Sequence, residues 1–230
     1  MPVRRFCFSP GFLLLTLLFV ALTLSLGFWQ LDREKQKRAL LEMYETRSQS
    51  SVPLETVIDD WQANQYQRIE AEGNFLPDKQ IFLENQVREG QVGYHAYIPF
   101  RTDGNTTILV NTGWQKELQE NDEISDGQVQ IEALLRPPPE VGLRLGSLEQ
   151  TSFDRPYRTP YVDIGWIGKR LDLDLSPFVL LLAKGKDGVI ATDWTPVRMS
   201  PEQHRGYAVT WFTLAVALVA LFLAYSFRKE

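Results

Sequence analysis

Two uncharged apolar stretches constrain the fold of this 230-residue chain more than any other feature. Residues 11–28 and 208–227 lack Asp, Glu, Lys and Arg and consist mainly of Leu, Phe, Val and Ala. A membrane-spanning helix needs about 20 such residues, with about 17 as the lower limit. The second stretch reaches that length, and the first does so once Trp29 is counted as an interfacial anchor. The sequence therefore predicts two membrane spans.

The first span has an alternative interpretation as a cleaved signal peptide, because Arg4 and Arg5 precede its apolar core. Two features favour a retained anchor instead. The core is longer than the roughly 7–15 residues of a typical signal peptide. Its exit, Gly27-Phe28-Trp29-Gln30, is bulky and lacks an Ala-x-Ala-like cleavage site.

Two spans place both chain ends on one side of the membrane and the segment between them on the other. Basic residues flank both ends of the first span, so the Lys and Arg count does not decide the sidedness. Glu34 and Arg38 are spaced for a helical ion pair, which favours a charged stalk after the first span. The expected order is an N-terminal tail, a span, a stalk, a domain, a span and a C-terminal tail at residues 1–10, 11–29, 30–49, 50–198, 200–227 and 228–230.

The middle segment has the size of one domain with its own core. Its short β-branched and aromatic runs predict strands at 66–71, 81–83, 92–100, 106–111, 129–135, 178–183 and 189–191. The turn Asp103-Gly104-Asn105 makes two of these runs a hairpin, and one short helix is expected at 162–171. The predicted fold class is a membrane protein with two transmembrane α-helices flanking a β-rich (α+β) domain, built as a curved sheet or small barrel.

Composition and motifs exclude several functions. The formal net charge of −5 argues against a nucleic-acid partner, and a single cysteine, Cys7, cannot form an intrachain disulfide. The chain has no Ser nucleophile elbow, phosphate-binding glycine loop, His-Glu-x-x-His or Cys-x-x-Cys motif. With only His95 and His204, a histidine-rich metal site cannot form. We therefore expect a protein that is not an enzyme.

His204 is the one candidate for chemistry. Ser200 and Gln203 form a Ser-x-x-Gln capping box, and Pro201 suits the first helical position. This pattern predicts a helix start that places His204 in the first turn of the second span, where water meets lipid. His95, by contrast, lies in a predicted strand and is expected to be packed or hydrogen-bonded.

Tyr207, Ala208 and Trp211 follow His204 at +3, +4 and +7, so they share its helix face. A neutral imidazole is a common ligand of haem iron, and the two aromatic residues would supply an apolar wall for a macrocycle. The alternative is an ordinary interfacial histidine among the aromatic residues that span ends attract. On the residues alone, this alternative is favoured.

Four motifs occur along the chain in a fixed order. They are Gly27-x-Trp29-Gln30-x-x-Arg33-x-x-x-Lys37, Tyr66-x-Arg68-Ile69-x-x-x-Gly73-x-Phe75, Ile108-Leu109-Val110-Asn111-x-Gly113-Trp114, and His204-x-x-Tyr207-Ala208-x-x-Trp211-Phe212. In this order and spacing, within a two-span chain, they resemble the Surfeit locus protein 1 family. Thr112 stands where that family usually has Arg, and Gln203 stands where Asn is frequent.

The resemblance implies a bacterial assembly factor for haem-copper cytochrome c oxidase that assists haem a insertion into subunit I or stabilises it there. It implies that His204 is an axial ligand of haem a, framed by Tyr207, Trp211, Trp29 and Gln30. Implied partners are subunit I, other oxidase assembly factors and the haem a synthesis enzymes. The implied location is the inner membrane, with the middle domain periplasmic.

Two alternative functions are compatible with the same span and domain pattern. A haem-independent interaction protein would hold an oxidase subunit assembly intermediate through its spans and β-rich domain. A membrane enzyme acting on a lipid or on haem finds no support, since the sequence contains no set of nucleophile, base and orienting residue.

Overall fold

The computed structural model describes residues 10–119, 127–139, 153–183, 196–197 and 199–227. It divides into two compact units. The helical unit comprises residues 1–43 and 195–230, and the barrel unit comprises residues 44–194.

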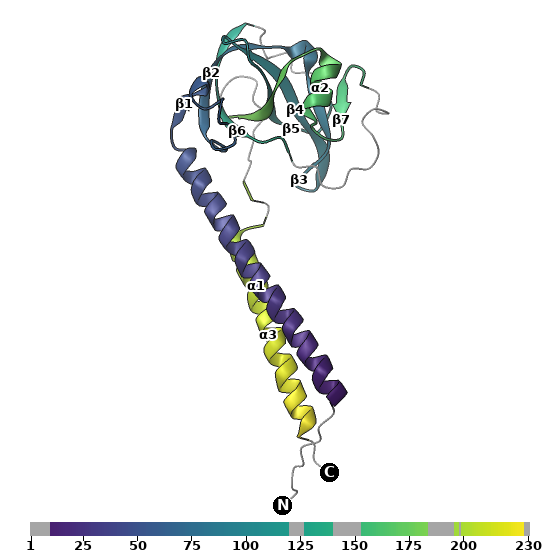
Figure 1. Ribbon diagram of the computed structural model, residues 1–230. Helices are drawn as coiled ribbons and strands as arrows, with labels where there is room; N and C mark the ends of the chain where they lie inside the picture. The colour runs from purple at the N-terminus through teal and green to yellow at the C-terminus, as the bar shows by residue number, and fades with distance from the viewer. Residues whose placement is uncertain (1–9, 120–126, 140–152, 184–195, 198, 228–230) are drawn as a thin grey trace, which may run out of the picture. The chain divides into compact units, whose positions relative to one another are not determined.

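The helical unit is a pair of long helices that run side by side in opposite directions, α1 (Pro10–Arg47) and α3 (Pro201–Ser226) (Figure 1). Ring contacts join them along their length. The ring centroids of Phe12 and Phe222 are 5.5 Å apart, and those of Phe28 and Phe212 are 5.3 Å apart. Both helices are long and apolar enough to cross a membrane. The chain is thus a membrane protein with two candidate spans.

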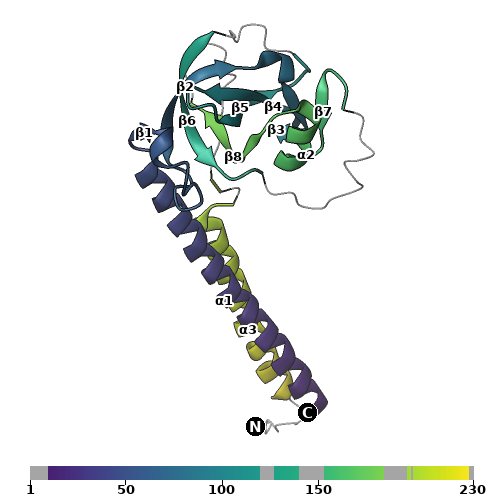
Figure 2. The same ribbon diagram turned by 45° about the horizontal axis from the view of Figure 1, so that its top comes forward.

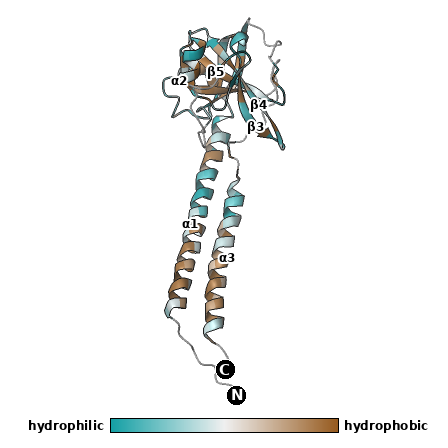
Figure 3. Ribbon diagram, turned by 90° about the vertical axis from the view of Figure 1, so that its right-hand side faces the viewer, coloured by the Kyte–Doolittle hydropathy of each residue, from teal (hydrophilic) through white to brown (hydrophobic). Residues whose placement is uncertain are grey.

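Helix α1 continues without a break from its apolar half into a charged half, as the change from brown to teal in Figure 3 shows. The expected ion pair forms, with Arg38 Nη2 2.9 Å from Glu34 Oε1. Gln36 donates to Asp32 at 2.7 Å and accepts from Arg33 at 2.8 Å. These contacts between residues three and four positions apart stabilise the exposed part of the helix. Pro10 already belongs to α1, and the remainder of the two expected tails lies outside the described residues.

The barrel unit contains one sheet of eight strands in the order β1-β2-β6-β8-β5-β4-β3-β7. The strands are β1 (Ser51–Pro53), β2 (Arg68–Phe75), β3 (Ile81–Arg88), β4 (Gln91–Thr102), β5 (Thr107–Gln115), β6 (Gln128–Arg136), β7 (Tyr157–Thr159) and β8 (Leu175–Leu182). Two short 3-10 turns, η1 (Leu54–Thr56) and η2 (Pro77–Lys79), and one helix, α2 (Ile164–Leu171), complete the described elements. An additional pairing of β2 with β4 closes β2, β6, β8, β5 and β4 into a five-stranded barrel (Figure 2).

Side chains alternate between the interior of the barrel and its outer face, as the two-residue period of a strand requires. In β8, Phe178 and Leu180 point into the barrel core, whereas Val179 points outward and packs with Ile167 and Leu171 of α2. At the closure, a Cβ built on Gly73 would lie 2.1 Å from the Arg101 carbonyl oxygen. Only glycine permits the two strands to approach this closely.

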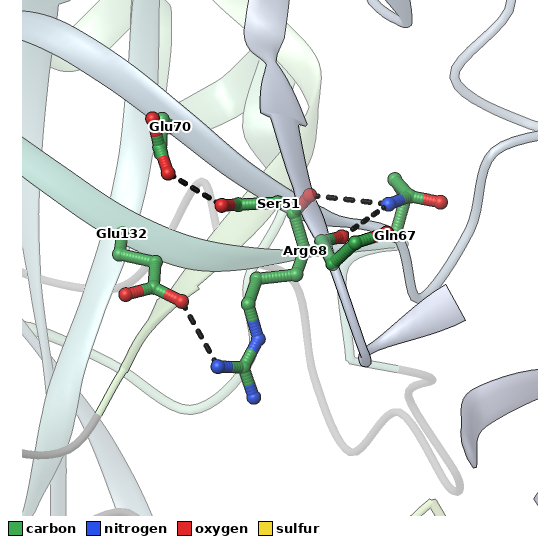
Figure 4. A network of polar contacts seen from close by, with 6 residues as sticks. Ser51, Gln67, Arg68, Glu70 and Glu132 are labelled. Carbon is green, nitrogen blue, oxygen red and sulfur yellow. Dashed lines mark hydrogen bonds and ion pairs between the residues drawn. The ribbon is translucent and has the colours of Figure 1, made fainter. Parts of the chain in front are cut away.

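Polar contacts support the outside of the barrel near β1 (Figure 4). The Ser51 hydroxyl donates to the Glu70 carboxylate, which joins β1 to β2. Arg68 Nη1 lies 2.9 Å from Glu132 Oε1 and joins β2 to β6. Both partners of this ion pair are partly exposed, so its contribution to stability is small, about 0–1 kcal/mol.

The predicted fold class is confirmed. The first six expected strands each coincide with an observed strand, and the expected hairpin pairs Phe100 with Ile108. The expected helix forms, with Asp163 Oδ1 accepting from the Trp166 amide at 2.9 Å as its N-cap. The seventh expected strand, 189–191, lies outside the described residues.

Candidate functional site

The candidate site lies where α3 begins. The Ser200 Oγ accepts from the Gln203 amide at 3.3 Å, and the Gln203 side chain accepts from the Ser200 amide at 2.9 Å. This is the predicted capping box, with Pro201 at the first helical position. The cap leaves little freedom in the first turn of α3, so it sets the position of His204.

His204 is buried, with 8 % of its surface exposed, and it faces α1. Its Nδ1 lies 2.7 Å from Gln30 Oε1, a side chain 174 positions away in the sequence. Within the described part of the chain, Nε2 has no hydrogen-bond partner. The arrangement resembles that of a metal-ligating histidine, in which one ring nitrogen is held by a protein acceptor and the other is available to the metal.

Contacts on both sides of this pair hold the two helices together. Toward the charged end of α1, Arg38 lies 2.9 Å from Glu34 and 3.8 Å from Glu202 of α3. Toward the apolar end, a Cβ built on Gly27 would lie 2.5 Å from the Phe212 ring, so the helices pack closely there. The polar pair therefore sits between an ion pair and a tight apolar contact.

The other predicted pocket residues are placed differently. Tyr207 is 52 % exposed and Trp29 is 49 % exposed, whereas Trp211 is partly buried. Trp29 points about 100° around α1 from Gln30, and the Arg33 guanidinium lies over its ring at 5.6 Å. The structure thus brings His204 and Gln30 together and leaves Tyr207 and Trp29 on the surface of the helix pair.

The donor set limits which metals the chain could hold. Among the described residues, no group of three or more His, Cys, Asp or Glu side chains could bind a bare metal ion. A haem needs fewer protein ligands because its ring nitrogens already occupy four positions on the iron. His204 supplies one imidazole nitrogen, Nε2, that has no hydrogen-bond partner among the described residues, and such a nitrogen is a common ligand of haem iron.

A second polar cluster is buried in the barrel unit. The pKa of His95 is lowered, mainly because the imidazole is buried, although the Gly113 backbone acts in the opposite direction. Burial also raises the pKa of Tyr97 to about 12. Asn111 lies beside both side chains, and its Oδ1 accepts from the Gly113 amide at 2.9 Å. His95 is therefore largely packed, as expected from its place in a strand.

Sequence reasoning missed two elements of these sites. One is the contact between Gly27 and Phe212. The only sequence feature that indicated it was a glycine one turn before Gln30. The other is a hydrogen bond in the barrel unit, in which Trp114 Nε1 donates to the Gln86 carbonyl at 2.7 Å. The Trp114 indole lies so close to Gly93 that a Cβ built there would be 2.6 Å from it. The sequence feature that indicated this contact was the presence of Gly93 and Trp114 on the two strands of the predicted hairpin.

Comparison with known proteins confirms the resemblance noted in the sequence. The model of the SURF1 family matches residues 17–216. A SURF1-like protein of Rickettsia prowazekii is 30 % identical over 230 residues, covering 94 % of this chain and 88 % of the relative. A SURF1-like protein of Rickettsia felis is 27 % identical, covering 92 % of this chain and 95 % of the relative.

A more distant match covers part of a longer protein. The cytochrome oxidase assembly protein SHY1 of Saccharomyces cerevisiae is 27 % identical over 133 residues, covering 51 % of this chain and 33 % of the yeast protein. The family model spans far more than half of the chain, and the Rickettsia relatives match it almost end to end. The chain therefore belongs to the SURF1 family.

Proposed function

We propose that this protein is an assembly factor for a haem-copper cytochrome c oxidase that receives haem a at His204 and assists its insertion into, or stabilisation in, subunit I. The buried contact between His204 Nδ1 and Gln30 Oε1 carries this proposal, since it leaves Nε2 as the coordinating nitrogen. Family membership and the similarity to the yeast cytochrome oxidase assembly protein SHY1 support the oxidase role.

The proposed setting is the inner membrane, with the barrel unit on the periplasmic side. Both helices have the length and apolarity of membrane spans. The ring contacts of Phe12 and Phe28 with α3 need the apolar half of α1, which favours a retained anchor over a cleaved signal peptide. Subunit I, other assembly factors and the haem a synthesis enzymes are the proposed partners.

In this proposal the protein's own residues bind and orient, and none performs a covalent step. Haem a would supply the iron and the macrocycle, and His204 Nε2 would be the protein nitrogen that holds the iron. Trp211 is partly buried two turns after His204 on α3 and would provide apolar surface for the macrocycle. Tyr207 and Trp29, both half exposed, would border the site from the surface of the helix pair. No enzymatic activity is proposed.

The test is the absorption spectrum of the full-length protein purified in detergent from cells that make haem a. We expect a haem a spectrum in the wild type and its loss in His204→Ala. Gly206→Ala is the matched control, because Gly206 lies two residues further along α3 and a Cβ there has no atom within 4 Å. Equal haem in the wild type and His204→Ala, or no haem in the folded wild type, would overturn the proposal.

One observation favours the haem-independent alternative, in which the protein holds an oxidase subunit intermediate. Val87 and Val92 are cross-strand partners near the turn of the β3–β4 hairpin, and they are 67 % and 63 % exposed. A partner protein that docks on this hairpin would cover the exposed apolar pair. If this alternative is correct, Val87→Ser with Val92→Ser lowers oxidase maturation, whereas His204→Ala leaves it unchanged.

A further inference from the structure

We propose that Gln30 is a positioning residue for His204: its side-chain oxygen holds the ring proton on Nδ1 and thereby presents Nε2 with a free lone pair. This inference rests on the proposed function for its haem readouts, although the tautomer itself can be tested without haem. It assigns to α1 a specific part in a site whose ligand comes from α3.

The first step is geometric. The distance of 2.7 Å between Nδ1 and Oε1 lies at the short end of the normal range for an N–H···O bond. The imidazole is 8 % exposed, so water competes little for Nδ1. A hydrogen bond in such surroundings is stronger than one in water, and leaving its donor unsatisfied costs about 1–3 kcal/mol.

The second step is chemical. A neutral imidazole carries one N–H donor and one lone-pair nitrogen, and its environment selects the tautomer. The Gln30 atom that faces Nδ1 is the amide oxygen, which can only accept, so we assign the ring proton to Nδ1. Nε2 then keeps its lone pair, which is the form that binds iron. Without Gln30, the proton is free to occupy Nε2 and block coordination.

The third step is the placement of Gln30 itself. Gly27 lies one turn before it and packs against Phe212, and Arg38 lies two turns after it and contacts Glu202. These two contacts set the register of α1 against α3 on both sides of the pair. Gln30 is therefore held opposite His204 by the helix packing and needs no large change to make its bond.

The fourth step concerns the electronic effect on a bound iron. When Nδ1 donates a hydrogen bond to an acceptor, Nε2 becomes a stronger electron donor to the metal. A carboxylate acceptor has a larger effect than an amide acceptor. Such outer contacts typically change metal affinity by about 10–100-fold when removed. Changing Gln30 should therefore alter both the retention of haem and the properties of its iron, without altering the ligand.

The test compares full-length wild type with Gln30→Glu, which keeps an acceptor, and Gln30→Leu, which removes it. Gln36→Leu is the matched control, because Gln36 is an exposed glutamine on the same helix that bonds only to its neighbours Asp32 and Arg33. In haem-free protein at pH 8, ring ¹⁵N NMR reports the tautomer of His204, with His95→Gln assigning the second histidine. We expect Nδ1–H in the wild type and Gln36→Leu, and a shift toward Nε2–H in Gln30→Leu.

In haem-loaded protein, the readouts are the midpoint potential and the iron–histidine stretching frequency. Gln30→Glu should lower the potential and raise the frequency, whereas Gln30→Leu should do the reverse and retain about tenfold less haem. An Nε2–H tautomer in the wild type, or unchanged potential and frequency in both variants, would overturn the role of Gln30. Failure of the haem proposal is a different outcome, namely haem that does not depend on His204.

Discussion

Gly27 of α1 lies so close to Phe212 of α3 that a Cβ built on the glycine would fall 2.5 Å from the aromatic ring. The ring of Phe28 packs against Phe212 at 5.3 Å in an edge-to-face arrangement. Substitution of Gly27 therefore requires the Phe212 ring or the two helices to move. The close packing of the helix pair at this point depends on the absence of a side chain at Gly27. The contact between Gln30 and His204, one turn away, depends on the same packing.

We expect Gly27→Ala to destabilise the helix pair by about 1–3 kcal/mol, the usual cost of overpacking. Even 1 kcal/mol raises the separated population about fivefold. The measurement is the alkylation rate of Ala208→Cys in a Cys7→Ser background, since Ala208 is buried between the helices. Gly11→Ala is the control, because no atom lies within 4 Å of a Cβ at that position. Equal alkylation rates in the two variants would contradict the close contact.

The hydrogen bond between Trp114 and Gln86 leads to a second prediction, in the barrel unit. A Cβ at Gly93 would lie 2.6 Å from the indole and 2.4 Å from the Gln115 carbonyl oxygen. The carbonyl belongs to the paired strand and cannot rotate away. We expect Gly93→Ala to lower the free energy of unfolding by about 1–3 kcal/mol.

Urea unfolding of the full chain in detergent, followed by circular dichroism, measures this loss. Trp114→Phe should cost about 1 kcal/mol through the lost hydrogen bond to Gln86, in addition to any cavity it leaves. Gly104→Ala is the matched control, because its nearest neighbour, Thr102 Oγ1, is 3.7 Å from the added Cβ. If Gly93→Ala unfolds at the same urea concentration as Gly104→Ala, the indole does not lie over Gly93.

Local patterns predicted most of this architecture because they report on local forces. Two uncharged apolar stretches predicted the two candidate spans, and the Ser-x-x-Gln box predicted the start of α3. The alternation of apolar and polar residues predicted the strands of the hairpin. The parallel pairing of β5 with β8 and the closure of β2 on β4 were not predicted. Such pairings depend on which distant strand edges meet, and a run such as Phe178-Val179-Leu180 fits many partners.

The candidate site shows the same division. His204 was identified from its place in a helix start, and Gln30 from a motif at the exit of the first span. Their contact joins residues 174 positions apart, and no spacing within one helix encodes it. Tyr207 was grouped with His204 on one helix face, but in the structure its side chain is 52 % exposed. A residue three positions after His204 is rotated about 60° around the helix axis, away from the face that contacts α1.

A third prediction concerns the cap of α2. Asp163 Oδ1 accepts from the Trp166 amide at 2.9 Å, and no other acidic residue lies in the first turn. Removing an N-cap side chain typically costs about 1 kcal/mol. We expect Asp163→Ala to lower the unfolding free energy of the full chain by that amount, and Asp163→Ser to recover most of it. An unchanged Asp163→Ala protein would show that the outer-face packing of Ile167 and Leu171 alone sets the helix.

The fourth prediction is a pH dependence from His95. Burial lowers the pKa of this imidazole from its ordinary value of 6.5, and the charges of Arg136 and Arg88 act in the same direction. Its Nδ1 is buried and has no hydrogen-bond partner among the described residues. Between the lowered pKa of the folded state and pH 6.5, the unfolded chain therefore binds a proton that the folded chain does not. The stability contributed by neutral His95 is complete above that pH and declines as the pH falls below it.

Unfolding of the full chain in detergent, measured between pH 7.5 and 5.5, checks this sign. The slope due to one proton is at most about 1.4 kcal/mol per pH unit. We expect His95→Gln to flatten the curve below pH 6.5, whatever its effect on stability at pH 7.5. His204→Gln identifies the source, because these are the chain's only two histidines and that variant retains His95. A curve that keeps its full slope in His95→Gln would assign the proton to another group, since Gln does not titrate in this range.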